Sequence, residues 1–324
     1  MSYVITAIAH GKQFPQGISN SITSLIEKLP LKLVSVVKLS SDRATDYEVQ
    51  LDIAKSGIEN PKQSFVDELA VKVHTQLKET HLDGVDLIFQ KNDENRKNKK
   101  LAVFDMDSTL IEQEVIELIA AQAHCEKEVA AVTRAAMNGE LDFKQSLARR
   151  VALLKGIESK DLWDSLKPQL KFTNGVRELC KFLKAKGAKL AVFSGGFLPL
   201  ANYAKEQLGL DYAFANVLGT EFNAEGKEVL SGETVGEVVD GQKKRKFMID
   251  IAAENGIPLS KAVATGDGAN DLPMMQAAGF GIAWNAKPKV QREAPCCLNS
   301  NSLEDSLYIY GYNDSEIDEV LGKK

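Results

Sequence analysis

Two aspartates, Asp105 and Asp107, follow the short apolar run Leu101–Phe104 and belong to the segment DMDST. If the run is a β-strand, both carboxylates can face its carboxyl end. A pair with this spacing is also a common turn former or helix N-cap. An uncompensated charge directly after a buried strand is unfavourable, and a metal ion or a phosphate group would compensate it. The segment is therefore a candidate for metal or phosphate chemistry.

A second acidic turn, GDGAND at residues 266–271, follows the apolar run Ala262–Thr265. It adds Asp267 and Asp271 to the first pair of carboxylates. Hard carboxylate oxygens without a nearby histidine or cysteine suit Mg²⁺ better than zinc. The EF-hand pattern is absent, the turn does not match GxGxxG, and the sequence has no GxxxxGK[ST] segment. A calcium loop, a dinucleotide site and a P-loop are therefore disfavoured.

Two further segments carry groups that suit a phosphate. The turn SGG at residues 194–196 follows the apolar run Lys189–Phe193. A hydroxyl beside backbone amides near a helix N-terminus binds phosphate well. The basic run QKKRK at residues 242–246 offers three lysines. This run suits a solvated helix start, or one lysine reaches the carboxylates and supplies the positive charge that a phosphoryl group there needs.

The elements that position these turns alternate between strand and helix after residue 100. Such alternation favours an α/β fold with a parallel sheet covered by helices. The three turns that follow strands then lie at one edge of the sheet, where ligands bind in such folds. About 80 residues of mostly helical pattern separate the first strand from Lys189–Phe193. This connection is far longer than a usual crossover, so we expect a helical cap at about residues 114–175.

Residues 1–90 have the order βαββαβ, with strands expected at Tyr3–Ala9, Leu31–Leu39, Tyr47–Ala54 and Val85–Phe89. By this order the segment resembles the small ACT-type regulatory domain. The polar run KNDENRKNKK at residues 91–100 follows, and we interpret it as a solvated linker. The remaining expected parts are a main domain at residues 101–312 and a C-terminal tail at residues 313–324.

Composition excludes several classes of protein. The chain has 324 residues, 44% of them hydrophobic and 26% charged, which is typical of globular domains. A net charge of −5 disfavours attraction to nucleic acid or to an anionic membrane. No apolar stretch is long enough to span a membrane, and the first residues lack a secretory signal pattern. Four cysteines without a CxxC pair favour a reducing, cytoplasmic compartment.

Along the chain the four segments follow one another as DMDST, SGG, QKKRK and GDGAND, and in this order they resemble the haloacid dehalogenase superfamily of phosphotransferases. Further segments narrow the resemblance to its phosphoserine phosphatase family and extend it over about Lys99 to Tyr310. These are Glu114, Met137-x-Gly139, Leu141-Asp142-Phe143, Ser146-Leu147 with Arg150-Val151, SGGF at 194–197 and DYAFAN at 211–216. The resemblance implies a Rossmann-like parallel sheet with a helical cap inserted after the first motif. It also implies hydrolysis of O-phosphoserine to serine, the last step of serine biosynthesis.

The resemblance implies a chemical role for each acidic residue of the first turn. Asp105 would be the nucleophile that becomes an aspartyl-phosphate. Asp107 would protonate the leaving serine oxygen and then deprotonate the attacking water. Mg²⁺ would be held by Asp105, Asp267 and the backbone carbonyl of Asp107.

The other turns would bind the phosphoryl group. Ser194, the amide of Gly195 and Lys244 would hold its oxygens, with Lys244 preferred to its neighbouring lysines for its spacing to the following helix. Asn270 would contact the substrate. Asp271 would support the metal site or orient Lys244.

Substrate selection is expected in the cap. Phosphoserine carries an ammonium group, for which Glu114 is a candidate partner, and a carboxylate, which Arg150 can bind through two hydrogen bonds. Met137 and Phe143 would close the pocket against water, or they are packing residues. Without the resemblance, Arg150 is equally well explained as a solvated neighbour of Arg149.

Two alternatives stay open at this point. One is a phosphatase of the same superfamily that acts on another small phosphomonoester. The other is an amino-acid sensor whose N-terminal segment binds the ligand, although the intact Asp105, Asp107, Lys244 and Asp267 argue against a degenerate scaffold. A homodimer is also possible.

Overall fold

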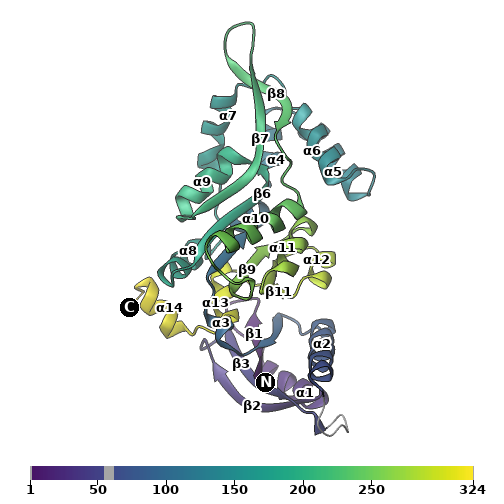
Figure 1. Ribbon diagram of the computed structural model, residues 1–324, viewed down its shortest axis with the longest axis vertical. Helices are drawn as coiled ribbons and strands as arrows, with labels where there is room; N and C mark the ends of the chain where they lie inside the picture. Colours follow the sequence, from purple (N-terminus) through teal and green to yellow (C-terminus); the bar gives the residue numbers. More distant parts are fainter. Residues whose placement is uncertain (1, 55–61, 324) are drawn as a thin grey trace.

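The computed structural model describes residues 2–54 and 62–323, and Figure 1 shows their arrangement. In this part of the chain the strands form one four-stranded and one seven-stranded sheet. We call the elements from β1 to β4 the N-terminal unit and those from β5 to α14 the main unit. Among the described residues, no helix has the length and apolar character needed to cross a membrane.

The N-terminal unit has the predicted order βαββαβ, and this prediction is confirmed. Its strands pair antiparallel in the order β2-β3-β1-β4. The helices α1 and α2 turn their apolar sides, including Ile22, Ile26 and Val73, towards one face of this sheet. The bounds are β1 Ser2–Ala9, α1 Ile18–Lys28, β2 Leu31–Lys38, β3 Ala44–Leu51, α2 Gln63–Glu79 and β4 Val85–Lys91.

The main unit is built on the second sheet, whose order is β11-β10-β9-β5-β6-β7-β8. Neighbouring strands from β11 to β7 run parallel, and β8 pairs antiparallel to β7. The predicted parallel α/β fold is therefore confirmed. The strands are β5 Leu101–Phe104, β6 Lys189–Phe197, β7 Tyr212–Phe222, β8 Glu228–Val235, β9 Ala262–Gly266, β10 Phe280–Trp284 and β11 Cys296–Leu298.

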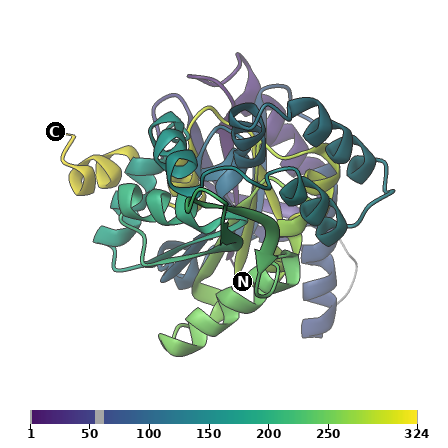
Figure 2. The same cartoon turned by 90° about the horizontal axis from the view of Figure 1, so that it is seen from above.

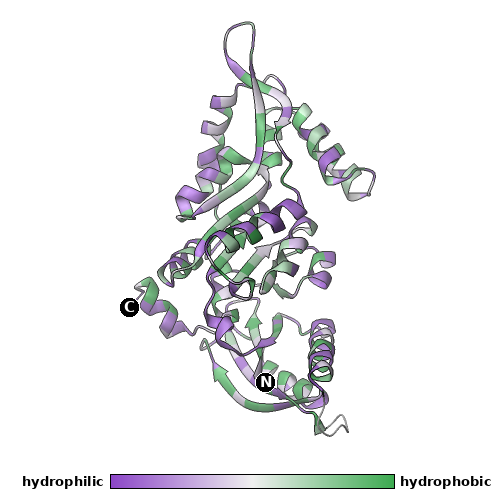
Figure 3. Ribbon diagram, in the orientation of Figure 1, coloured by the Kyte–Doolittle hydropathy of each residue, from purple (hydrophilic) through white to green (hydrophobic). Residues whose placement is uncertain are grey.

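Both faces of the central strands are buried, as parallel sheets require. Leu101 and Val103 of β5 face α10 and α11, whereas Ala102 and Phe104 face the core that includes α8 and α13. Figure 3 accordingly shows apolar colouring along β6 and mixed colouring on an outer helix such as α2. The helices flanking the sheet are α8 Val176–Ala185, α9 Leu198–Leu208, α10 Gly241–Glu254, α11 Leu272–Ala277, α12 Pro288–Glu293 and α13 Ser306–Ile309.

A helical insertion between β5 and β6 forms the cap. It comprises α4 Val115–Gln122, α5 Glu126–Met137, α6 Phe143–Ala152 and α7 Ser159–Leu166. The cap lies at the opposite end of the molecule from the N-terminal unit, which is the distant, fainter part when the molecule is seen from above in Figure 2.

The hairpin formed by β7 and β8 was not expected from the sequence. β7 pairs with β6 at its start and with β8 further along. The hairpin is also bound to the cap, since the amide of Gly156 donates to the carbonyl of Leu230 and the amide of Leu230 donates to the carbonyl of Ile157, both at 2.8 Å. It therefore connects the central sheet to the cap.

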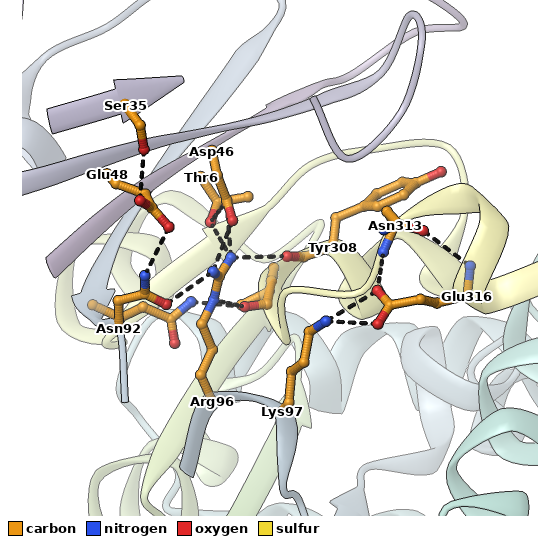
Figure 4. A network of polar contacts seen from close by, with 12 residues as sticks. Thr6, Ser35, Asp46, Glu48, Asn92, Arg96, Lys97, Tyr308, Asn313 and Glu316 are labelled. Carbon is orange, nitrogen blue, oxygen red and sulfur yellow. Dashed lines mark hydrogen bonds and ion pairs between the residues drawn. The ribbon is translucent and has the colours of Figure 1, made fainter. Parts of the chain in front are cut away.

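The prediction of a solvated linker at residues 91–100 is wrong for two of its basic residues. Arg96, on the short helix α3 (Glu94–Lys97), is 6% exposed, and Lys99 is 5% exposed. The guanidinium of Arg96 donates to both carboxylate oxygens of Asp46 on β3, at 2.7 and 2.8 Å. It also donates to the backbone carbonyls of Tyr308 and Ile309 in the main unit (Figure 4). The charge of Arg96 can be buried because Asp46 pairs with it. The Nζ of Lys99 instead lies 5.7 Å from the centre of the Phe280 ring, and burial lowers the pKa of Lys99 to about 8.

Further contacts join the N-terminal unit to residues 292–314 of the main unit. The nitrogen Nε2 of His74 lies 2.7 Å from the carbonyl of Pro295, and Asp86 accepts from the backbone and side-chain amides of Asn299. Arg43 pairs with Asp305. The two units therefore share an interface and not only a connecting segment.

Residues 313–324, expected to be a tail, contain the helix α14 (Asp314–Leu321). Asn313 caps its N-terminus by accepting from the amide of Glu316. Ile317 and Leu321 are buried in the core that includes α8.

Candidate active site

The carboxyl ends of β5, β6 and β9 are adjacent, because these three strands are neighbours at the centre of the sheet. A cavity of about 160 Å³ lies between this edge and the cap. The residues around it come from the strand ends and from the cap. They are Asp105, Asp107, Glu114, Ile116, Phe143, Leu147, Arg150, Gly195, Gly196, Phe197, Asp267, Gly268, Asn270 and Lys287.

Lys244 lies beneath the cavity and is fully buried on α10. Its Nζ is 2.7 Å from Oδ1 of Asp105 and 2.7 Å from Oδ1 of Asp271. Burial lowers the pKa of Lys244, but the two carboxylates outweigh it and raise the pKa above its usual value. The other lysines point elsewhere, since Lys243 pairs with Glu237 and Lys246 with Asp250. Lys244 is thus a fixed positive charge under the site.

Asp105 directly follows β5, with its backbone extended. Its Oδ1 accepts from the amide of Met106 at 2.7 Å and contacts Lys244. This hydrogen bond and this ion pair, which are those found for the side chain among the described residues, both involve Oδ1. Oδ2 is therefore the oxygen that we assign to chemistry in the cavity.

Asp107 lies in the turn Met106–Leu110, where Ser108 has a positive φ of 53°. Its Oδ1 accepts from the amide of Val115 at 2.6 Å, and its Oδ2 accepts from the hydroxyl of Ser194 at 3.2 Å. Burial, with the charges of Asp105 and Glu114, raises the pKa of Asp107 to about 7. Near neutral pH this carboxyl group can hold a proton and also release it.

The SGG turn at the end of β6 has no room for larger side chains. A Cβ on Gly196 would lie 3.0 Å from Oγ of Ser194 and 3.3 Å from Oδ2 of Asp107. A Cβ on Gly195 would lie 3.1 Å from Cζ of Phe143 in the cap. The amide of Gly196 donates to Oγ of Ser194 at 2.8 Å, just before α9 begins. The turn therefore lies close to Asp107 and to the cap, at the N-terminus of a helix, which is a position suited to an anion.

Three carboxylates are close enough to share a cation. Oxygens of Asp105, Asp267 and Asp271 lie within 4.8 Å of one another. Burial, with the charges of Asp105 and Glu114, raises the pKa of Asp267 to about 7. Such repulsion is relieved by a bound cation, and an all-oxygen donor set fits a hard divalent ion.

The cap contributes one face of α6 and one acidic residue. Phe143, Leu147 and Arg150 line the cavity together, because residues four and seven positions apart share a helix face. Asp142 starts this helix with a capping box, accepting from the amide of Gln145 at 2.8 Å. Glu114 accepts from the hydroxyl of Ser108 at 2.9 Å. Arg150 and Glu114 therefore place opposite charges in one cavity.

The structure brings together most residues that the sequence singled out. Those that line the cavity are Asp105, Asp107, Glu114, Phe143, Arg150, Gly195, Asp267 and Asn270, and those beneath or beside it are Ser194, Lys244 and Asp271. The side chain of Met137 lies outside the described part, so its predicted role stays a prediction.

Sequence reasoning missed Lys287, which lines the cavity and lowers the pKa of Asp267, against the stronger effect of burial. Lys287 follows β10, the neighbour of β9, so the carboxyl end of a fourth parallel strand was the available signal. That strand end carries no acidic or glycine-rich turn, and it was therefore not recognised.

Comparison with known proteins identifies the family of the chain. The family of haloacid dehalogenase-like hydrolases matches residues 99–279. The phosphoserine phosphatase of Saccharomyces cerevisiae is 48% identical over 97% of this chain and 98% of its own length. That of Methanocaldococcus jannaschii is 44% identical over 65% of this chain and 97% of its own length.

Two solved structures are similar over different shares of the chain. A haloacid dehalogenase family hydrolase of Salmonella enterica covers 96% of this chain and 99% of its own, with a TM-score of 0.74 and 28% identity. A phosphoserine phosphatase solved as a phospho-aspartyl intermediate analogue covers 65% of this chain and 99% of its own, with a TM-score of 0.59 and 43% identity. The chain therefore belongs to the haloacid dehalogenase-like hydrolases and, within them, to the phosphoserine phosphatase family.

Proposed function

We propose that this chain hydrolyses O-phospho-L-serine to L-serine and phosphate, the last step of serine biosynthesis. The observation that carries the proposal is the cavity itself, in which Glu114 and Arg150 lie opposite the acidic strand ends. A phosphate ester that also bears an ammonium and a carboxylate group matches this distribution of charges. The similarity to named phosphoserine phosphatases supports the same substrate.

In the first step, Oδ2 of Asp105 attacks phosphorus, and the bond between phosphorus and the serine oxygen breaks. The proton on Asp107 passes to that oxygen, so serine leaves as the free alcohol. In the metal-free protein, burial and the charges of Asp105 and Glu114 raise the pKa of Asp107 to about 7, so this carboxyl group binds a proton more readily than an exposed aspartate. The product of this step is a phosphate bonded to the carboxyl group of Asp105.

In the second step, Asp107 acts as the base. It removes a proton from a water molecule, which attacks phosphorus while the bond to Asp105 breaks. Inorganic phosphate leaves, and Asp105 regains its carboxylate. Through both steps, the hydroxyl of Ser194, the amide of Gly195 and Lys244 hold the phosphoryl oxygens, and Asn270 contacts the substrate. Asp271, 2.7 Å from Nζ of Lys244, keeps that lysine in place.

We propose Mg²⁺ as the cation for the acidic cluster, held by Asp105, Asp267 and the backbone carbonyl of Asp107. Its donors would all be oxygens, which Mg²⁺ prefers. When bound, it supplies positive charge that neutralises the cluster and stabilises charge on the phosphoryl oxygens. Asp271 lies within the same group of oxygens, but its hydrogen bonds to Lys244 and to the amide of Gly268 assign it a supporting role.

The experiment that tests the function is a phosphate-release assay over a panel of phosphomonoesters, with and without Mg²⁺. We expect the highest kcat/KM for phosphoserine and loss of turnover after chelation. Asp105→Asn should abolish turnover while the thermal unfolding curve stays close to wild type, because an amide cannot act as the nucleophile. Mass spectrometry must exclude deamidation of the variant. Wild-type turnover by a verified Asp105→Asn protein would contradict the assigned role.

We propose a cytoplasmic location, supported by the four cysteines, all of which lie in the described part of the chain as free thiols. We also keep residues 91–100 as the boundary between the N-terminal and main units. The ACT-like character of the N-terminal unit and a homodimer stay predictions, and the mass of the protein in solution tests the second.

A further inference from the structure

Asn216 lies where the pairing of β6 with β7 becomes irregular. Phe193 lies opposite Phe214, and the next partners are Phe197 and Asn216. Four residue steps along β6 are thus matched by only two along β7. The two extra residues belong to the SGG turn, which leaves the ladder and approaches the cavity. Such an interruption leaves backbone groups without ladder partners.

The side chain of Asn216 replaces those partners. Its Nδ2 donates to the carbonyl of Gly195 at 2.8 Å and to the carbonyl of Gly196 at 3.2 Å. The side chain is 2% exposed, so water does not compete for these bonds. Both donors of the amide are used on two consecutive glycines, which are the residues with the greatest backbone freedom. Asn216 therefore restricts the turn that carries the amides.

The other end of the same amide reaches the element that carries Lys244. Oδ1 of Asn216 accepts from the backbone amide of Val239 at 2.8 Å. Val239 directly precedes Asp240, whose side chain caps the N-terminus of α10. Lys244 lies in the first turns of that helix and reaches Asp105. One buried side chain thus connects two of the elements assigned to the phosphoryl group.

We propose that Asn216 is a positioning residue that sets the Gly195 amide and the Nζ of Lys244 in fixed relation to each other. This inference rests on the proposed phosphate-binding role of those two groups. Asn216 itself does not line the cavity and does not contact the substrate. A residue of this kind affects every phosphomonoester alike, because all of them present the same phosphoryl oxygens. It differs in this respect from Arg150, whose proposed partner is found only on substrates with a carboxylate.

The substitution Asn216→Asp tests the proposal with almost no change in size. The aspartate keeps an oxygen for Val239 but turns a second oxygen towards two carbonyls, so the glycine turn loses its donors. Displacement of reacting groups by about 1 Å lowers rates by on the order of 100-fold, so kcat/KM should fall about 10- to 100-fold. We expect the same factor for phosphoserine and for O-phosphoethanolamine. The inhibition constant of inorganic phosphate should rise in parallel.

Asn255→Asp is the matched control. Nδ2 of Asn255 also donates to two oxygens, the carbonyl of Ile251 at 2.8 Å and the hydroxyl of Tyr212 at 3.0 Å. This residue lies at the other end of α10, away from the cavity, so kcat/KM should stay at the wild-type value. Asn216→Ser, which keeps one hydroxyl donor and adds no charge, is the second variant and decides the matter if Asn216→Asp does not fold.

Assays on folded protein, well below the unfolding temperature, separate positioning from stability. Lower Tm with wild-type kcat/KM and wild-type phosphate affinity in either folded variant would overturn the proposal, because Asn216 would then only hold the fold. Unequal losses on the two substrates would also overturn it. Calorimetric binding of inorganic phosphate to wild type and variants gives a readout independent of turnover. If the wild-type protein binds phosphate but does not hydrolyse phosphoserine, the proposed function fails and the positioning role is still decided by binding.

Discussion

Arg150 offers the sharpest separation of recognition from chemistry. Its guanidinium lines the cavity from the cap, and its Nε donates to the backbone carbonyl of Ser146 at 3.3 Å. No carboxylate of the described residues forms an ion pair with it within 4 Å, although Glu114 and Asp107 are near enough to oppose the effect of burial, which lowers the pKa of Arg150. The terminal nitrogens are therefore available to a carboxylate that arrives with the substrate.

The substitution Arg150→Ala removes this partner and leaves the acidic strand ends intact. A hydrogen bond to a charged group contributes about 1.5–3 kcal/mol, so kcat/KM for phosphoserine should fall about 10- to 200-fold. O-phosphoethanolamine keeps the phosphate ester and the ammonium group but lacks the carboxylate. Its kcat/KM should change little, because Arg150 has nothing to bind on that substrate.

The measurement is kcat/KM for both substrates, from initial rates of phosphate release. Arg149→Ala is the control, since Arg149 is the exposed neighbour on the same helix and does not line the cavity. It should behave as wild type on both substrates. Equal losses on both substrates in Arg150→Ala would refute the reasoning, because Arg150 would then support the cap and not select the substrate.

Two further predictions concern charge pairs of the N-terminal unit, one with Arg96 of the following segment and one within the unit. Arg96→Ala should lower the free energy of unfolding by about 3–5 kcal/mol in urea titrations, because it leaves the buried Asp46 without its ion-pair partner. Lys97→Ala removes an exposed ion pair and should lower it by less than about 1 kcal/mol. Similar losses in both variants would contradict the stabilising role assigned to the buried pair. Nε2 of His10 lies 3.1 Å from Oδ1 of Asp86, and this nearby carboxylate raises the pKa of His10 against a smaller opposing effect of burial. The protonated His10 stabilises the folded protein fully below the ordinary histidine pKa of about 6.5, and this stabilisation is lost as the pH rises through the raised pKa. The free energy of unfolding should therefore fall more for wild type than for His10→Gln between about pH 6 and 8. An equal loss in the two proteins would exclude His10 as the group responsible.

The arrangement of the strand ends could be predicted from the sequence because its signals are local. Each of β5, β6 and β9 is an apolar run followed at once by a polar or glycine-rich turn. Parallel strands place such turns at the same edge, whatever the details of packing. The helical cap followed equally from the length of the connection.

The burial of Arg96 could not be predicted in this way. Its partners, Asp46 and the carbonyls of Tyr308 and Ile309, are 50 residues or more distant in sequence, so only the tertiary structure brings them together. The sequence of a charged run without apolar residues does not show whether its side chains lie in solvent or pair with buried carboxylates. Asn216 was singled out only as part of the DYAFAN segment, and its structural role was missed for a similar reason. The carbonyls that it binds, those of Gly195 and Gly196, are 21 and 20 residues distant in sequence.

The attachment of the β7–β8 hairpin to the cap has a mechanical consequence for the entry of substrate. The cap is connected to the sheet by the chain at its two ends. The backbone hydrogen bonds between Leu230 and the cap residues Gly156 and Ile157 add a third connection. A movement of the cap that keeps these bonds would therefore move the hairpin as well. Within the hairpin, the pairing of β7 with β8 shifts between Leu218 and Thr220, and a Cβ on Gly219 would lie 2.5 Å from Oγ of Ser231. Any rotation that takes Phe143 away from the SGG turn would therefore have to carry the β7–β8 hairpin with the cap.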